Sequence, residues 1–228
     1  MDIEKEIKKQ NNIKLNHEKW NDEGKWINDG EEWSGHFGTT DILWDTILYP
    51  KIGEFIKGNV LEIAPGKGRI TRKLLEYDIK LDILDLSPIC IDRCKERFSS
   101  KVDNYYVGNG SDLRDINSGS KDFVLSFDSF VHMSEEVIDS YLNEIYRVLK
   151  PGGYCWIHHA NLSGQENNFL NWAGRSSMTN EKFHQLAIGN ELKVEHQEYI
   201  RWDSVDLVGG KNINLPEWFK DGLSLVRK

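Results

Sequence analysis

The sequence has no excess of basic residues and no pattern of paired cysteines. Its 29 Lys and Arg residues face 37 Asp and Glu residues, which gives a formal net charge of −8. A protein that grips the nucleic-acid backbone normally carries a basic patch, so nucleic acid is a poor candidate partner. The three cysteines are odd in number and lack CxxC spacing, so we expect neither a disulfide framework nor a zinc site.

Long apolar runs are also missing. The first twenty residues are charged throughout and lack the apolar core of a signal peptide. No stretch approaches the roughly 20 apolar residues that span a bilayer. We therefore expect a cytoplasmic protein without membrane insertion.

Tryptophan and glycine are abundant near the start of the chain. Residues 1–16 are polar and predict a frayed or helical arm. Residues 20–38 contain Trp20, Trp26 and Trp33, which either fill a core or close over a ligand. At 228 residues the chain suits one well-buried domain. We expect an N-terminal arm and lid segment (1–40) packed on a domain formed by residues 41–228.

The remainder alternates between strand-like and helical patterns. Strands are predicted at 59–64, 80–87, 102–108, 121–127 and 153–159, with two more in 192–202 and 222–228. Helices are predicted at 41–57 (interrupted near Pro50), after Gly68, after Ser87-Pro88, at 134–150 and at 179–188. This order predicts an α/β fold with a mostly parallel seven-stranded sheet, helices on both faces and a C-terminal antiparallel hairpin.

Polar residues and glycines gather where these strands end. Ligands of such sheets bind at the carboxyl ends of the strands. Asp85 follows the glycine turn by roughly 20 residues, where an acid accepts hydrogen bonds from a ribose diol. Thr71 stands where a dinucleotide site wants a small residue, which disfavours a nicotinamide cofactor. The further acids, Glu62 and Asp112, favour a positively charged ligand that carries an adenine.

Five segments together resemble class I S-adenosylmethionine-dependent methyltransferases, which have a Rossmann-like fold. They are EIAPGKG (62–68), DLS (85–87), GNGSDLRDI (108–116), SFDSFVHM (126–133) and YRVLKPGGY (146–154). The resemblance implies S-adenosyl-L-methionine as cofactor, held by Glu62, Ala64, Gly66, Gly68, Asp85, Leu86, Ser111, Asp112, Leu113 and Phe127. Ala64 departs from the usual first glycine, but its methyl group is small and binding is expected to survive.

A finer resemblance concerns the acceptor. The chain looks most like bacterial O-methyltransferases of sugars and surface (capsular) polysaccharide precursors, which implies a hydroxyl of a sugar or sugar nucleotide. Another small acceptor, an amine or a carboxylate, is the alternative. A nicotinamide-linked oxidoreductase and a binding module without chemistry are more distant alternatives. A homo-oligomer is left open.

Histidine suits the role of general base because its pKa lies near neutrality. We expect His159 to be the base in preference to His158, since alternation points them to opposite faces and His159 is nearer the strand end. His132 is a third candidate, with packing beside the cofactor as its other interpretation. Asp128 is expected to orient a histidine, to bind the acceptor or to contribute with a histidine to a divalent-cation site. No ligand cluster has a diagnostic metal spacing, so no metal is predicted. Further acceptor contacts are expected from His36 in a lid and from Trp172, Arg175 and Ser176.

Overall fold

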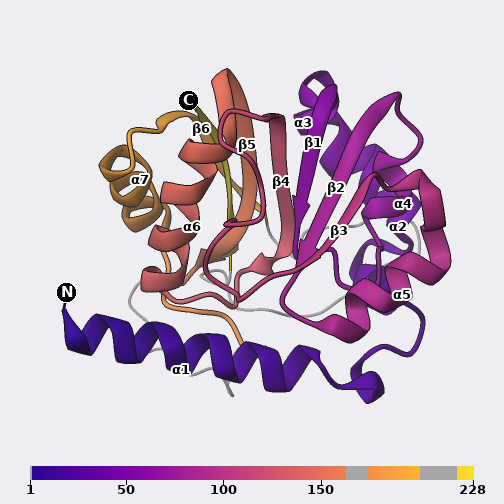
Figure 1. The fold of residues 1–228 in the computed structure, drawn as a ribbon, viewed down its shortest axis with the longest axis horizontal. Coiled ribbons are helices and arrows are strands. Elements are labelled where there is room, and N and C mark those ends of the chain that lie inside the picture. Colours follow the sequence, from indigo (N-terminus) through magenta and orange to yellow (C-terminus); the bar gives the residue numbers. More distant parts are fainter. Residues whose placement is uncertain (1, 163–173, 201–219) are drawn as a thin grey trace.

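The computed structural model describes residues 2–162, 174–200 and 220–228. Its strands form a seven-stranded sheet between two layers of helices, and the first helix lies across the ends of the strands (Figure 1). Within these described ranges no helix is long and apolar enough to cross a membrane.

The sheet has the predicted topology. Its strands are β1 (Gly58–Ile63), β2 (Ile79–Asp85), β3 (Asn104–Val107), β4 (Lys121–Phe130), β5 (Leu149–Asn161), β6 (Lys193–Ile200) and β7 (Lys220–Arg227). They lie in the order β3-β2-β1-β4-β5-β7-β6. β1 to β5 are parallel, and β7 runs antiparallel to both β5 and β6. The chain order reverses between β1 and β4, which opens a crevice at their carboxyl ends.

Helices form where the sequence places caps and apolar faces. They are α1 (Ile3–Trp20), α2 (Thr40–Leu43), α3 (Tyr49–Ile52), α4 (Thr71–Leu74), α5 (Pro88–Phe98), α6 (Glu135–Val148) and α7 (Asn180–Gly189). Ser87 and Thr179 cap α5 and α7 by accepting from the Cys90 and Lys182 N–H groups. The seven apolar residues predicted to share one face of α6 and its end are all buried: Val137, Ile138, Tyr141, Leu142, Ile145, Val148 and Leu149.

One local expectation is corrected, and one helix start lacks the usual side-chain cap. The helix predicted across 41–57 is not broken at Pro50, because a π-helical turn (Trp44–Leu48) joins α2 to α3 and Pro50 lies in the first turn of α3. A proline there loses no helical hydrogen bond. Ser134 does precede α6, but its hydroxyl makes no capping bond. Its N–H donates instead to Asn12 Oδ1 of α1, at 3.0 Å.

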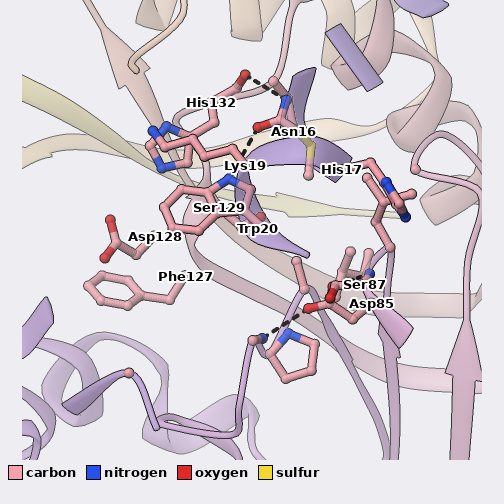
Figure 2. A pocket seen from close by; sticks show the side chains of 18 of the residues that line it. Asn16, His17, Lys19, Trp20, Asp85, Ser87, Phe127, Asp128, Ser129 and His132 are labelled. Atoms are coloured by element: carbon pink, nitrogen blue, oxygen red, sulfur yellow. Dashed lines mark hydrogen bonds between the residues drawn. The ribbon is translucent and has the colours of Figure 1, made fainter. Parts of the chain in front are cut away.

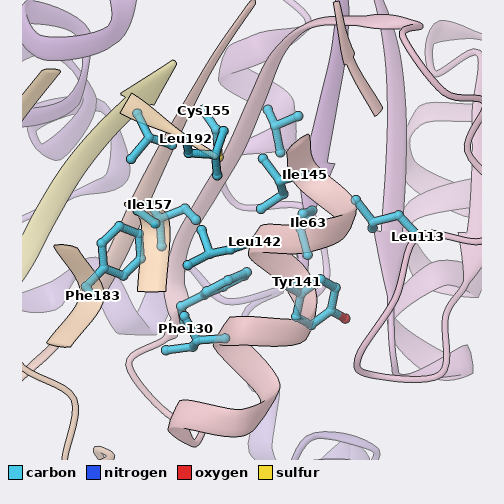
Figure 3. Packing of buried hydrophobic residues seen from close by; sticks show 14 of the residues in the cluster. Ile63, Leu113, Phe130, Tyr141, Leu142, Ile145, Cys155, Ile157, Phe183 and Leu192 are labelled. Atoms are coloured by element: carbon cyan, nitrogen blue, oxygen red, sulfur yellow. The ribbon is translucent and has the colours of Figure 1, made fainter. Parts of the chain in front are cut away.

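Alternation along the strands sends side chains into two cores. On one face Val60 and Leu81 pack with residues of α2 to α5, such as Leu74. On the other, Ile63 and Ile157 pack under α6 and α7, as Figure 3 shows. Each fully buried aliphatic or aromatic side chain contributes roughly 1.5–3 kcal/mol, so these two layers fix the strand ends firmly. The division into an arm (1–40) and a domain (41–228) stays a prediction.

Candidate functional site

A cavity of about 450 Å³ opens at the carboxyl ends of β1, β2 and β4. Its walls come from the loops after these strands and from α1 with the segment that follows it. Figure 2 shows Asp85 and Ser87 in one part of the cavity, with Phe127, Asp128 and His132 in another. The first part is called the Asp85 end below, and the second the Asp128 end.

The Asp85 end is built by the glycine turn. The Gly66 and Ser87 N–H groups donate to the two carboxylate oxygens of Asp85 at 3.0 and 2.8 Å. Asp85 is buried, and burial raises its pKa to about 6 although these backbone donors lower it. Gly66 has φ 58°, and a β-carbon there would lie 2.6 Å from the Trp26 ring. Both backbone conformation and space therefore require glycine at this position.

Ala64 lines the cavity beside this turn and adopts a left-handed backbone conformation, with φ 58°. An alanine pays roughly 1–2 kcal/mol in that region, where glycine would be unstrained. Its N–H donates to the Leu84 carbonyl at 2.7 Å, which helps to hold the turn. Leu86 and Phe127, also predicted to hold the cofactor, line the same cavity.

Glu62 and Gly68 stand behind the turn rather than in the cavity wall. Glu62 is buried, accepts a hydrogen bond from Thr71 at 2.6 Å, and has its pKa raised by burial to about 7. The Thr71 hydroxyl thus donates to the Glu62 carboxyl group. Thr71 is the residue that departs from the dinucleotide fingerprint. A side chain at Gly68 would collide with Phe98 of α5, so this glycine allows the turn to pack closely.

Three predicted cofactor residues after β3 are not brought to the cavity. Ser111, Asp112 and Leu113 are absent from its wall. Asp112 pairs with Arg114 at 2.6 Å, which lowers the pKa of the carboxyl to about 2. The Leu113 N–H, expected to meet the adenine, already donates to Glu144 at 3.0 Å. Of this loop it is Gly110 that lines the cavity.

Asp128 occupies the other end in a strained conformation. Its φ is 60°, and its carboxylate pairs with Arg69 at 3.0 Å and lies 4.0 Å from Arg175. The strand pairing of β4 with β5 shifts register between Ser126 and Phe130, which places Asp128 in an irregular segment. Backbone strain of this kind persists only where surrounding contacts determine it.

A closed ring of hydrogen bonds and ion pairs connects Asp128, His158, Asp221 and Arg175. The Asp128 N–H donates to His158 Nδ1 at 3.0 Å. Because Nδ1 accepts, the ring proton is on Nε2, which donates to Asp221 at 3.1 Å. Asp221 of β7 pairs with Arg175 at 2.8 Å, and Arg175 returns to Asp128. His158 and Asp221 are fully buried, so His158 reaches the cavity through its neighbours Asp128 and Phe127, on whose ring it stacks at 4.8 Å.

His132 does line the cavity. Its Nδ1 lies 2.8 Å from the Gly174 carbonyl and therefore donates, which leaves the lone pair on Nε2. Its ring lies 5.0 Å from that of Trp20. Burial, with Arg175 and Lys19 nearby, lowers the pKa of His132 to about 3. This histidine is neutral at physiological pH.

His159 faces the opposite side of β5. It is fully buried, bonds to the Ala160 carbonyl and the Ser224 hydroxyl at 2.8 Å each, and stacks on Phe183 of α7 at 4.2 Å. It is absent from the cavity wall. As expected from strand alternation, His158 and His159 point to opposite faces of the sheet. His159, which is nearer the strand end, is the one that faces α7 and not the cavity. The placement therefore argues against His159 as the base.

Helix α1 contributes a wall that the sequence did not reveal. The Asn16 side chain donates to the His132 carbonyl at 3.2 Å, and Asn12 is likewise bonded to that carbonyl, at 3.1 Å. Lys19 and Trp20 line the cavity. The available signal was two asparagines four residues apart in a helix otherwise rich in Lys and Glu. The first residues thus form a docked helix and not a frayed arm.

The aromatic segment after α1 also reaches the cavity. Trp26, Trp33 and His36 line it, and the Trp20 ring lies 5.9 Å from each of Trp26 and Trp33. These three residues were lid candidates from the sequence, whereas Arg69, which directly follows the glycine turn and also lines the cavity, was missed. Arg175 lines the cavity as expected, whereas Trp172 lies outside the described residues. In the described part of the chain, no group of three or more His, Cys, Asp or Glu side chains could hold a metal ion.

Known proteins match parts of this sequence and its fold. Residues 60–153 match a family model described as a methyltransferase domain. A malonyl-[acyl-carrier protein] O-methyltransferase from Marinomonas sp. (strain MWYL1) is 28% identical over 169 residues, which cover 73% of this chain and 60% of that protein. The chain thus spans less than two thirds of the length of this curated relative.

Solved structures share the fold at low identity. A SAM-dependent methyltransferase from Leishmania major superposes with a TM-score of 0.65 at 10% identity, covering 94% of this chain and 82% of that chain. The cyclopropane synthase MmaA2 from Mycobacterium tuberculosis gives a TM-score of 0.61 at 15% identity, covering 85% and 88%.

The fold is the one seen in solved S-adenosylmethionine-dependent methyltransferases, and residues 60–153 carry the match to a methyltransferase domain. These matches support the enzyme class and the cofactor, S-adenosyl-L-methionine, that were expected from the sequence. The curated relative carries a different acceptor in its name, so a sugar acceptor gains no support from it.

Proposed function

We propose that this protein transfers the methyl group of S-adenosylmethionine to an oxygen atom of a small acceptor bound in the cavity. One observation carries the proposal: a single cavity joins the Asp85 end, built like a nucleoside site, to the charged and aromatic Asp128 end. A cofactor and an acceptor can therefore meet within one enclosed space.

The residues of the Asp85 end fit the cofactor. Asp85 is a buried carboxylate fixed by two backbone donors, as a ribose diol requires of its acceptor. A β-carbon at Gly66 would collide with the Trp26 ring, which lines the same cavity. When bound, S-adenosylmethionine supplies an electrophilic methyl group on a sulfonium. Asp85, Ala64 and Gly66 would hold the ribose and methionine parts. Ser111, Asp112 and Leu113, which were expected to hold the cofactor, lie outside the cavity wall.

The side chains of this protein contribute mainly by positioning the acceptor relative to the methyl group. Methyl transfer needs the acceptor oxygen about 3 Å from the methyl carbon and in line with the bond that breaks, which is largely orientation. Asp128 and His132 form the polar wall for this purpose, and Trp20 with Trp33 form an apolar one. These rings provide a surface on which a sugar can stack, which supports a hydroxyl of a sugar or sugar nucleotide as acceptor.

A carboxylate is the second candidate acceptor, and one observation favours it. The pKa of His132 is lowered to about 3, so this histidine is a weak base for removing a hydroxyl proton. A carboxylate arrives already ionised and needs no base. The Marinomonas relative is named as an O-methyltransferase of a malonyl group.

Two experiments test the function. Calorimetry with S-adenosylhomocysteine should show binding in the micromolar range, with none for NAD; binding of NAD alone would overturn the proposal. Incubation with methyl-labelled cofactor and a panel of sugar nucleotides and carboxylic acids then identifies the acceptor. Label released as methanol by mild base indicates an ester, and stable label on oxygen indicates an ether. Label found only on amines would exclude O-methylation.

A further inference from the structure

The end of β4 carries a bulge at the cavity. β4 pairs with β5 at Ser126 and next at Phe130, and the three residues between them lie opposite a single residue of β5, His158. Asp128 is the middle residue of this bulge. On its other edge β5 pairs with β7 from Tyr154 to Asn161 without a register shift, so the irregularity belongs to β4. Bulges of this kind re-aim a side chain toward a site.

The His158 side chain takes the place of a ladder hydrogen bond in the bulge. Its Nδ1 accepts from the Asp128 N–H at 3.0 Å, and its Nε2 donates to Asp221 of β7 at 3.1 Å. Its ring also stacks on that of Phe127, with the ring centres 4.8 Å apart. One fully buried imidazole thus contacts two of the three bulge residues, one through its backbone and one through its ring.

This contact matters because Asp128 has an unfavourable backbone conformation. Its φ of 60° lies in the left-handed region, which residues with a side chain rarely adopt. Such a conformation persists only while neighbouring contacts determine it. The bond from the Asp128 N–H to His158 acts on the backbone itself, so its loss would let the backbone relax and turn the carboxylate away from its present direction.

The two oxygens of the Asp128 carboxylate have different surroundings. Oδ2 accepts a hydrogen bond from Arg69 at 3.0 Å, whereas Oδ1 lies 4.0 Å from Arg175, farther than a hydrogen bond allows. Asp128 lines the cavity beside Phe127, and 18% of its side chain is exposed (Figure 2). Each carboxylate oxygen has two lone pairs, so Oδ1 can accept a hydrogen bond from a ligand in the cavity.

We propose that His158 is a positioning residue: through the Asp128 N–H it holds Asp128 Oδ1 where this oxygen accepts a hydrogen bond from a hydroxyl group of the acceptor. The inference rests on the proposed function and narrows it to a hydroxyl, because an ionised carboxylate has no proton to donate and its charge repels Asp128.

The proton of that hydroxyl group passes to Asp128. As the acceptor oxygen bonds to the methyl carbon and the carbon–sulfur bond breaks toward sulfur, the hydroxyl proton moves to Asp128 Oδ1 and from there to solvent. A carboxylate suffices as the base, because an oxygen that gains a methyl group while it keeps its proton is strongly acidic.

Two substitutions at His158 separate its two hydrogen bonds. In His158→Asn the side-chain oxygen can take the place of Nδ1 and accept from the Asp128 N–H, while the bond to Asp221 is lost. In His158→Gln the longer amide reaches toward Asp221, and the Asp128 N–H loses its acceptor. Hydrogen exchange of the Asp128 amide, followed by NMR, should therefore be faster in His158→Gln than in His158→Asn. Equal exchange in the two variants would overturn the inference.

Kinetics are measured with methyl-labelled S-adenosylmethionine and the sugar nucleotide that takes up the most label. We expect kcat and kcat/KM to fall together, roughly 10- to 100-fold in His158→Gln and less than about threefold in His158→Asn, because a displacement of about 1 Å costs up to 10²-fold. Asp128→Asn keeps a residue that tolerates positive φ but cannot take a proton, so kcat should fall about 100-fold or more.

A matched control is available on the same strand. His159 is as fully buried as His158 but stacks on Phe183 of α7, away from the cavity. His159→Gln should therefore lower Tm and leave kcat, measured well below Tm, close to that of wild type. If His159→Gln lowers kcat as much as His158→Gln, or if both His158 variants keep the wild-type kcat, His158 is not a positioning residue.

The outcomes that overturn the inference are distinct from failure of the proposed function. If S-adenosylhomocysteine binds and label appears only on carboxylic acids, or if Asp128→Asn keeps full turnover, the roles of Asp128 and His158 are wrong while the methyltransferase proposal stands. If S-adenosylhomocysteine itself does not bind, the proposed function fails and this inference fails with it.

Discussion

Replacing Asp221 by asparagine removes one negative charge from the buried ring with almost no change in shape. Asp221 accepts hydrogen bonds from His158 and from Arg175, and all three side chains are buried. Although burial raises the pKa of Asp221, its pairing with Arg175 and the hydrogen bond from His158 hold that pKa well below the ordinary value. In Asp221→Asn the guanidinium remains buried without its main anion.

The expected loss of folding stability in Asp221→Asn is large. Breaking a buried ion pair by removing one partner costs about 3–5 kcal/mol, because a buried charge is left uncompensated. For a protein of this size, 1 kcal/mol corresponds to a change in melting temperature of roughly 2–4 °C, so we expect Tm to fall by about 6–20 °C. Adding Arg175→Met to Asp221→Asn should recover much of the loss, since both charges are then gone.

The assay is urea unfolding of the two single variants and the double variant, which yields the coupling energy. A loss under about 1 kcal/mol for Asp221→Asn, or no recovery in the double variant, would refute the ion-pair reasoning. The pH dependence gives a second check. Because the folded pKa is depressed, the contribution of Asp221 is complete above the unfolded pKa of about 3.9 and is lost as pH falls below it. The difference between wild type and Asp221→Asn should therefore shrink below about pH 4.

Three further predictions follow from single contacts. Gly222→Ala should cost about 1–3 kcal/mol in urea unfolding because the new β-carbon collides with the His159 ring, whereas Gly189→Ala, with nothing within 4 Å, should cost nothing. Burial raises the pKa of Glu62 to about 7, above its unfolded value of about 4.3, so wild-type stability falls as pH rises between these values. Glu62→Gln lacks this loss and should gain more Tm over wild type at pH 8 than at pH 5; an equal gain would contradict the assignment. Asp85→Asn should weaken S-adenosylhomocysteine binding about 10- to 100-fold by calorimetry, and unchanged affinity would remove Asp85 from the site.

The sheet could be predicted from the sequence because its signals are local and strong. The run NVLEIA and the face of α6 each have one dominant period, and both were found with boundaries within a few residues of the prediction. Pro50 shows the limit of such reasoning. A proline ends a helix only when the turn before it cannot widen. Here the π-helical turn before α3 accommodates Pro50.

The site was predictable where one turn determines it and unpredictable where distant elements meet. Asp85 follows from the spacing after the glycine turn. Which of His158 and His159 faces the cavity depends on which face of β5 packs under α6 and α7, and that tertiary contact is not encoded in the strand itself. The docking of α1 rests on Asn12 and Asn16, whose partner is a backbone carbonyl more than a hundred residues away.

That docking has a consequence for energetics. The cavity is walled on one side by α1 and on the other by strand ends, so a ligand that fills it touches both and binds the docked arrangement more tightly than any undocked one. By thermodynamic linkage, part of the binding free energy is then expressed as added stability of α1 on the sheet. Amide hydrogens of residues 3–20 should accordingly exchange more slowly in the complex, and the helix becomes a built-in reporter of occupancy.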